Sequence, residues 1–80
     1  MEYELNPHAK EEIERRRIPL DLLQQTMNEP QQVVPTYGGR KAYQSQFAFE
    51  DGRVYLLRVI VDDRTSPAKV VTAYRTSRIT

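Results

Sequence analysis

Residues 40–62 decide the fold, and they read RKAYQSQFAFEDGRVYLLRVIVD. From Arg40 to Glu50 two series of side chains alternate, which is typical of a β-strand with one buried face. One series is Tyr43, Ser45, Phe47 and Phe49, and the other is Ala42, Gln44, Gln46 and Ala48. Asp51-Gly52 favours a tight turn, and the strand that follows, Arg53–Asp62, is apolar in both series. The pattern predicts an antiparallel hairpin whose second strand is central and covered on both sides.

A last strand is predicted for residues 68–75, after a turn over residues 63–67. Alternation places Val70, Thr72 and Tyr74 on one face, and Val71, Ala73 and Arg75 on the other. The segment VVTAYRTSRI (residues 70–79) therefore presents hydroxyl groups and guanidinium groups close together. Such groups suit a phosphodiester, because cations meet its charge and hydroxyls donate hydrogen bonds. A terminal strand with a polar surface end is the alternative interpretation.

The first part of the chain has the pattern of helices. Met1–Leu5 alternates weakly and could form a short first strand. Asn6-Pro7 is a good helix start, and His8–Arg17 follows with acidic residues before basic ones, as the helix dipole favours. Ile18-Pro19 interrupts this helix, and a second helix is predicted over Pro19–Glu29.

Between the second helix and the hairpin, Gln32–Thr36 is predicted to be extended, and Pro35 restricts it to a sheet edge or a strand end. Gly38-Gly39 signals a turn. Together these elements predict an α+β protein with two N-terminal helices packed on a meandering antiparallel sheet of three or four strands. The 80 residues suffice for one domain, residues 1–80, with a single core.

The composition excludes several classes of function. There is no cysteine, so neither a disulfide framework nor a thiolate site is available. With one histidine and no cysteine, we expect no metal centre and no cofactor. The chain has no apolar run of membrane-spanning length and no signal-peptide core. These features predict a cytoplasmic protein without a membrane partner.

The net charge of +1 hides an asymmetry between the two halves of the chain. Residues 1–39 carry seven acidic and four basic side chains, whereas residues 40–80 carry four acidic and eight basic ones. The half predicted to form the sheet is therefore the basic one, which favours an anionic partner for the sheet. Scattered surface cations would give the same count.

Two features of the basic half could bind an anion. Arg58 interrupts the apolar run YLLRVIV of residues 55–61, and a charge in a central strand is costly unless it is paired or partly hydrated. Either it pairs with a carboxylate, such as Asp62 or one on a helix, or it opens into a groove on the face of Leu56. Gly38-Gly39 followed by Arg40-Lys41 could form a phosphate-binding loop or an ordinary hairpin turn with basic flanks.

His8 is the only histidine, and it lies one residue inside the first predicted helix. It is either a solvent-facing residue at a helix start or a proton-transfer group, because histidine side chains titrate near neutral pH. Its partner in acid–base catalysis must be a carboxylate, a tyrosine, or a cation that only stabilises charge.

At this point the whole pattern resembles a known family. The segments that carry the resemblance are NPHA (6–9), RRIP (16–19), GRKAY (39–43), YLLRVIV (55–61) and VTAYRTSRI (71–79). They resemble a bacterial family of small toxin-like proteins, abundant in cyanobacteria and long catalogued as a domain of unknown function. That family is grouped with the barnase/RelE-like superfamily of metal-independent ribonucleases, which share helices packed against an antiparallel sheet.

The resemblance implies a cytoplasmic toxin of a toxin–antitoxin system. It would be an endoribonuclease of the mRNA interferase type, acting on RNA or ribosome-bound mRNA and restrained by a cognate antitoxin protein. In such chemistry the ribose 2′-hydroxyl attacks the adjacent phosphate, cations stabilise the developing charge and an acid protonates the leaving 5′-oxygen. Carried over by position, the catalytic residues are His8, Arg58, Thr72, Tyr74 and Arg75. The RNA-binding residues are Arg40, Lys41 and Arg78.

A non-catalytic module that binds a small antitoxin-like partner is the alternative function. It would use the sheet edge near Val33-Val34 or the thin apolar stripe of the first helix. Salt separates the two hypotheses, because RNA binding through several cations weakens steeply with added salt.

Overall fold

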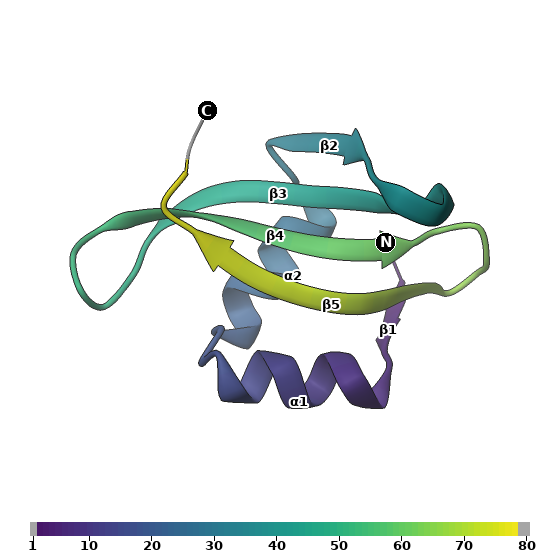
Figure 1. Cartoon of the computed structure of the whole chain (residues 1–80), viewed down its shortest axis with the longest axis horizontal. Coiled ribbons are helices and arrows are strands. Elements are labelled where there is room, and N and C mark those ends of the chain that lie inside the picture. Colours follow the sequence, from purple (N-terminus) through teal and green to yellow (C-terminus); the bar gives the residue numbers. More distant parts are fainter. Residues whose placement is uncertain (1, 79–80) are drawn as a thin grey trace.

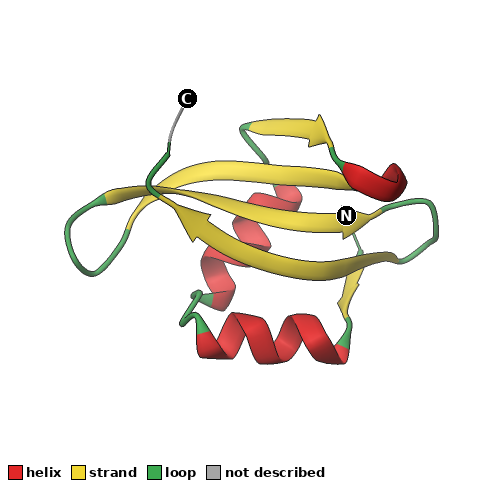
Figure 2. Cartoon of the chain, in the orientation of Figure 1, coloured by secondary structure: helices red, strands yellow, loops and turns green. Residues whose placement is uncertain are grey.

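The computed structural model describes residues 2–78 and contains two helices and a five-stranded sheet in the order β1-β5-β4-β3-β2 (Figures 1 and 2). The elements are β1 (Tyr3–Leu5), α1 (Pro7–Arg15), α2 (Leu20–Asn28), β2 (Gln32–Pro35), the 3₁₀ turn η1 (Tyr37–Gly39), β3 (Lys41–Ala48), β4 (Val54–Asp62) and β5 (Ala68–Thr76). No helix within residues 2–78 is long and apolar enough to cross a membrane.

The sheet is mixed, so the predicted antiparallel meander of three or four strands below two N-terminal helices is wrong. β1 precedes both helices and pairs in parallel with the start of β5, with Tyr3 opposite Ala68 and Leu5 opposite Val70. β2 forms the other edge and pairs antiparallel with β3. This parallel pairing brings together strands from opposite ends of the chain. The local pattern of a three-residue strand cannot predict such a long-range contact.

The hairpin that was predicted from Asp51-Gly52 is confirmed. β3 and β4 pair antiparallel from Lys41 opposite Val61 to Ala48 opposite Val54. Gly52 has a φ of 80°, a left-handed conformation that glycine adopts without the steric cost of a Cβ atom. This hairpin and β5, which pairs with β4, supply the three long strands of the sheet.

Both helices lie against the same side of the sheet. Figure 1 shows α2 behind β3 and β4, and α1 alongside β5. Asn6 begins α1 as predicted, because its side-chain oxygen accepts a 2.7 Å hydrogen bond from the Ala9 N–H. The core between helices and sheet contains Ile13, Leu23, Met27, Leu57, Val59 and Val61. Each such side chain contributes roughly 1.5–3 kcal/mol through its burial.

The opposite side of the sheet is not covered by a helix, and we call it the open face. β4 is central, but Leu56 and Arg58 point to the open face and stay partly exposed, so the prediction that this strand is covered on both sides is wrong.

A β-bulge in β5 decides which of its side chains reach the open face. Val61 lies opposite Val70, whereas Ile60 lies opposite Thr72, so Val71 is the extra residue. Val70 is therefore fully buried on the helix side, and Thr72 and Tyr74 belong to the open face. The prediction that Val70 shares a face with Thr72 and Tyr74 is wrong, because strict alternation cannot anticipate the bulge.

Candidate functional site

A row of four polar side chains crosses the open face, one from each of the strands β2, β3, β4 and β5. The strand register places Gln32 beside Gln44, Gln44 beside Arg58, and Arg58 beside Tyr74. Gln44 Nε2 donates to Gln32 Oε1 at 2.7 Å, and Arg58 Nε donates to Gln44 Oε1 at 2.9 Å. Arg58 Nη1 donates to Tyr74 Oη at 2.6 Å. We call these four residues the cross-strand row.

Arg58 is held in this row by neutral groups alone. Of the two alternatives for this residue, an ion pair with Asp62 or a helix carboxylate is wrong: the ion pairs formed among residues 2–78 do not include Arg58. Its guanidinium carbon lies 5.7 Å from the centre of the Tyr74 ring, a cation–π contact. A guanidinium has five N–H donors, and the row uses two of them. Three donors and the full positive charge remain for a ligand.

The cross-strand row lines a shallow cleft of about 460 Å³. The remaining lining residues are Val34, Leu56, Thr76 and Arg78. Among the described residues that line the cleft there are two arginines and no carboxylate or imidazole. The cleft is thus cationic, and apolar and hydroxyl side chains also line it. Such a lining suits a phosphodiester with its sugar.

Four of the eight residues predicted to act belong to the open face. Arg58, Tyr74 and Arg78 line the cleft directly. Thr72 lies on β5 opposite Ile60, one pair farther along the strand, and its Oγ1 is 3.4 Å from Nη1 of Arg16. Sequence reasoning missed Gln32 and Gln44. Gln44 belongs to the alternating series of the predicted hairpin. The structure nearly buries it, and a nearly buried amide in a strand needs hydrogen-bond partners.

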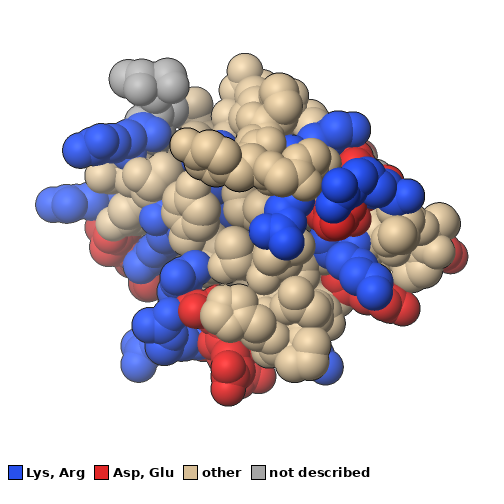
Figure 3. Space-filling view, turned by 45° about the vertical axis from the view of Figure 1, so that its right-hand side comes forward, with Lys and Arg blue, Asp and Glu red and all other residues tan. Residues whose placement is uncertain are grey.

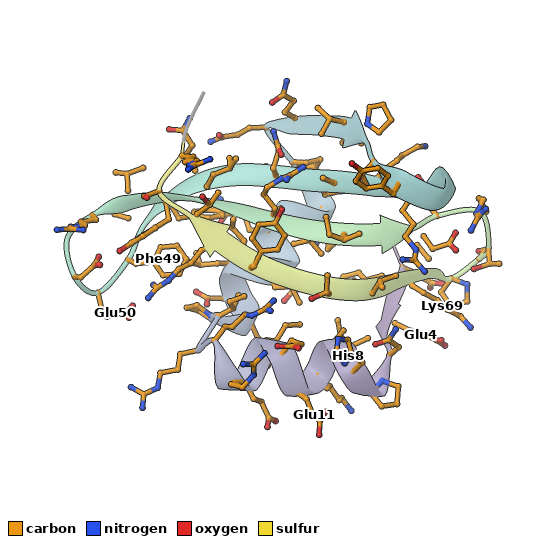
Figure 4. All side chains as sticks on the ribbon, in the orientation of Figure 1. Glu4, His8, Glu11, Phe49, Glu50 and Lys69 are labelled. Atoms are coloured by element: carbon orange, nitrogen blue, oxygen red, sulfur yellow. The ribbon has the colours of Figure 1, made fainter. Side chains whose placement is uncertain are left out.

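Arg75 lies on the other side of the sheet from Arg58 and takes no part in the cleft. Its guanidinium carbon is 4.5 Å from the ring centre of Phe49 and 4.7 Å from that of Tyr55. The carboxylate of Glu50 is 3.7 Å from Nη1 (Figure 4 labels Phe49 and Glu50 beside the hairpin). These contacts hold the cation on the side of the sheet opposite the cleft. The structure therefore does not bring Arg75 together with Arg58 and Tyr74.

His8 lies near the start of α1 and is not among the residues that line the cleft (Figure 4). Its side chain is two-thirds exposed, and its Nε2 is 3.5 Å from Oε1 of Glu12. A hydrogen bond from Arg15 holds the pKa of Glu12 below its usual value. The structure therefore gives His8 a helical carboxylate as its neighbour and separates it from the cross-strand row.

Arg40 and Lys41 lie at the end of the sheet where η1 leads into β3. Lys41 Nζ is 2.9 Å from Oδ2 of Asp63, and this pair raises the pKa of Lys41 and lowers that of Asp63. Asp62 binds Arg64 through two nitrogen–oxygen contacts of 3.0 and 2.8 Å, which hold the pKa of Asp62 far below its usual value. Figure 3 shows basic side chains beside acidic ones on this side of the molecule.

The Gly38-Gly39 segment is a hairpin turn. Gly38 and Gly39 have φ angles of 68° and 74°, and the Arg40 N–H donates to the carbonyl of Tyr37 at 3.3 Å. That amide is therefore engaged within the turn and not offered to a phosphate. Within residues 2–78, no three His, Asp or Glu side chains are grouped so that they could hold a metal ion.

A family model described as Domain of unknown function (DUF4258) matches residues 5–75. The match includes all four residues of the cross-strand row and ends before Arg78. No curated protein matches the chain, and no solved structure matches it. The family description assigns no activity, so the chemistry of the cleft has to carry the functional argument.

Proposed function

For this chain, which belongs to the DUF4258 family, we propose the function of a metal-independent endoribonuclease that acts as the toxin of a toxin–antitoxin system. The observation that carries the proposal is the cross-strand row. It holds Arg58 at the centre of an uncovered sheet face, without a carboxylate partner and with three N–H donors to spare. The proposed site of action is the cytoplasm, and the proposed substrate is RNA or ribosome-bound mRNA.

Arg58 is the proposed phosphate-binding residue. A guanidinium can donate two parallel hydrogen bonds to the non-bridging oxygens of a phosphodiester, and it keeps its charge at all physiological pH values. When the 2′-hydroxyl attacks the phosphorus, negative charge grows on those oxygens. Donors that are already in place stabilise this charge more in the transition state than in the ground state. Gln44 supports the reaction by fixing the plane of the guanidinium.

Tyr74 is the proposed proton donor. Its oxygen accepts a hydrogen bond from Arg58, so its own hydrogen is free to be donated into the cleft. That hydrogen can pass to the 5′-oxygen as the P–O bond breaks. Because no imidazole or carboxylate is among the described cleft residues, the 2′-hydroxyl loses its proton to solvent. A positioned base is worth about 10²–10⁴-fold in rate, so we expect slow turnover on free RNA.

The first experiment is cleavage of an end-labelled RNA in EDTA by the purified protein, by Arg58→Ala and by Arg15→Ala. Arg15 is the matched control, because it is an exposed arginine on α1 whose loss changes the net charge equally. We expect Arg58→Ala to cleave about 10²–10³-fold more slowly, as for removal of one oxyanion donor, and Arg15→Ala to match the wild type. Equal cleavage by Arg58→Ala and the wild type would contradict the proposal. A parallel assay on translating ribosomes tests the ribosome-bound substrate.

A non-catalytic interaction module remains the second candidate, and one observation favours it. Leu5, Ile13, Ile18 and Leu20 line an apolar hollow of about 180 Å³, and Leu20 is 63% exposed. A small antitoxin-like protein could cover this hollow whether or not the open face cleaves RNA. Binding to the hollow should hold in high salt, whereas RNA binding should weaken by orders of magnitude between 50 and 200 mM salt if several phosphates are bound.

A further inference from the structure

Within residues 2–78, Tyr37 is the most exposed of the large apolar and aromatic side chains, at 92%. Among residues 2–78 its hydroxyl has no hydrogen-bond partner, and its ring has no aromatic or cationic contact. The described part of the fold therefore gains no stability from a hydrogen bond, an aromatic contact or a cation–π contact of this side chain. We propose that Tyr37 is a stacking site for a base of the single-stranded RNA that the open face binds, an inference that rests on the proposed function.

The backbone holds this ring on a preformed turn. The Thr36 N–H donates to the Arg40 carbonyl at 2.9 Å, and the Arg40 N–H donates to the Tyr37 carbonyl at 3.3 Å. The Arg64 side chain of the loop after β4 lies against this turn, where a Cβ added to Gly39 would come within 2.9 Å of its Nη1. An exposed tyrosine on a turn held by backbone hydrogen bonds offers stacking area at little cost in conformational entropy.

The turn also lies at a suitable place relative to the cleft. It leads directly into β3, and Gln44 of the cross-strand row lies four residues after Arg40 on that strand. At about 3.3 Å per residue, the turn is roughly 13 Å along the strand from the row, within reach of a nucleotide or two on either side of the bound phosphate. Arg40 itself forms no ion pair among the described residues and interacts with Asp62 only at longer range, so its guanidinium can contact the RNA backbone between them.

The chemistry at the turn favours a nucleobase over a protein side chain. Protein partners anchor aromatic residues in apolar pockets that exclude water. Tyr37 lines neither the cleft nor the apolar hollow, Arg40 follows it three residues later, and Arg64 lies against Gly39 of the same turn. An open aromatic face beside cations is the arrangement on which successive bases of a single strand stack, with little dependence on sequence.

The test compares two strands of equal length, a 2′-O-methyl oligoribonucleotide that cannot be cleaved and an abasic strand with the same number of phosphates. Binding to the wild type, Tyr37→Ala and Arg58→Ala is measured by fluorescence anisotropy. We expect Tyr37→Ala to weaken binding of the base-carrying strand by about ten-fold, as for the loss of one stacked base, and to leave the abasic strand unaffected. We expect Arg58→Ala to weaken the binding of both strands. Thermal unfolding of Tyr37→Ala should match the wild type, since the ring is exposed.

A second variant gives an independent signal. The chain has no tryptophan, so the indole introduced by Tyr37→Trp is a unique fluorophore. We expect the base-carrying strand to quench it and the abasic strand to leave it unchanged. Tyr37→Ala that binds both strands like the wild type, or loses affinity for both equally, would overturn the stacking site. If Arg58→Ala still weakens binding in that case, the proposed function stands; if the wild type binds neither strand, both proposals fail.

Discussion

Two arginines on neighbouring strands occupy opposite faces of the same sheet, and their surroundings differ completely. Arg58 on β4 lies on the open face and donates hydrogen bonds to the Gln44 amide and the Tyr74 hydroxyl. Arg75 on β5 lies on the other face, where its guanidinium packs against the rings of both Phe49 and Tyr55. Among residues 2–78, the groups around Arg58 leave three of its N–H donors without a partner, whereas Arg75 packs against two aromatic rings and is paired with the Glu50 carboxylate.

An arginine in a strand can bind an anion only if its neighbours leave it free hydrogen-bond donors and space for the ligand. Nη1 of Arg75 is buried without a hydrogen bond, and the Glu50 carboxylate at 3.7 Å already balances its charge. An incoming phosphate would have to compete with this carboxylate for the guanidinium. Arg58 faces a cleft whose described lining contains no anion, so a phosphate meets no competitor there.

After Arg58, the largest effect on cleavage is expected at Tyr74, and it tests whether the open face performs chemistry as well as binding. Tyr74→Phe keeps the ring beneath the guanidinium and removes the one hydrogen that can be donated to the leaving oxygen. We expect RNA cleavage to fall by about 10²-fold, the lower end of general-acid catalysis, while RNA affinity changes by less than about three-fold. Single-turnover cleavage and anisotropy measure the two quantities. Weakened binding with unchanged single-turnover cleavage would assign Tyr74 to positioning the RNA.

A smaller effect, on stability alone, is expected at Arg75. Arg75→Ala removes two cation–π contacts of about 0.5–1 kcal/mol each together with the packing of the alkyl chain. We expect the free energy of unfolding in urea to fall by about 1–2 kcal/mol, with the cleavage rate of the folded protein unchanged. Arg15→Ala removes an exposed arginine on α1; it is the matched comparison and should change the free energy of unfolding by less than about 0.5 kcal/mol. Equal stability of Arg75→Ala and Arg15→Ala would mean that the ring contacts of Arg75 do not stabilise the fold.

The local parts of this fold follow from the sequence, and the long-range parts do not. The Asp51-Gly52 turn, the Asn6 cap and the three long strands each have a signal within about ten residues, and the structure has all of them. The parallel pairing of β1 with β5 has no such signal, because its two partners are at opposite ends of the chain. That single pairing turns the predicted antiparallel meander into a mixed sheet.

The candidate site was predicted only in part, because it too combines local patterns with contacts between strands. Parity along one strand correctly puts Arg58 with Leu56, and both line the cleft. Which residues of β3 and β5 lie beside Arg58 depends on register, and the bulge at Val71 changes that register within β5. Gln44 became a candidate only when the register placed its amide next to the guanidinium. Alternation along β5 correctly places Arg75 on the face opposite Tyr74, so the two residues cannot share one site although they are adjacent in sequence.

The smallest effect is expected at His8, the one imidazole in the chain. His8→Ala should leave RNA cleavage within about two-fold of the wild type, since the structure places His8 beside Glu12 and outside the cleft. The pH dependence gives a sharper measurement than the rate at one pH. A catalytic imidazole base would make the cleavage rate level off above about pH 6.5, whereas a 2′-hydroxyl that loses its proton to solvent gives a rate that keeps rising from pH 6 to pH 8. We expect the continued rise in the wild type and an identical profile in His8→Ala. A plateau that His8→Ala abolishes would mean that α1 supplies the base, and the catalytic site would then extend from the open face around the edge of β5.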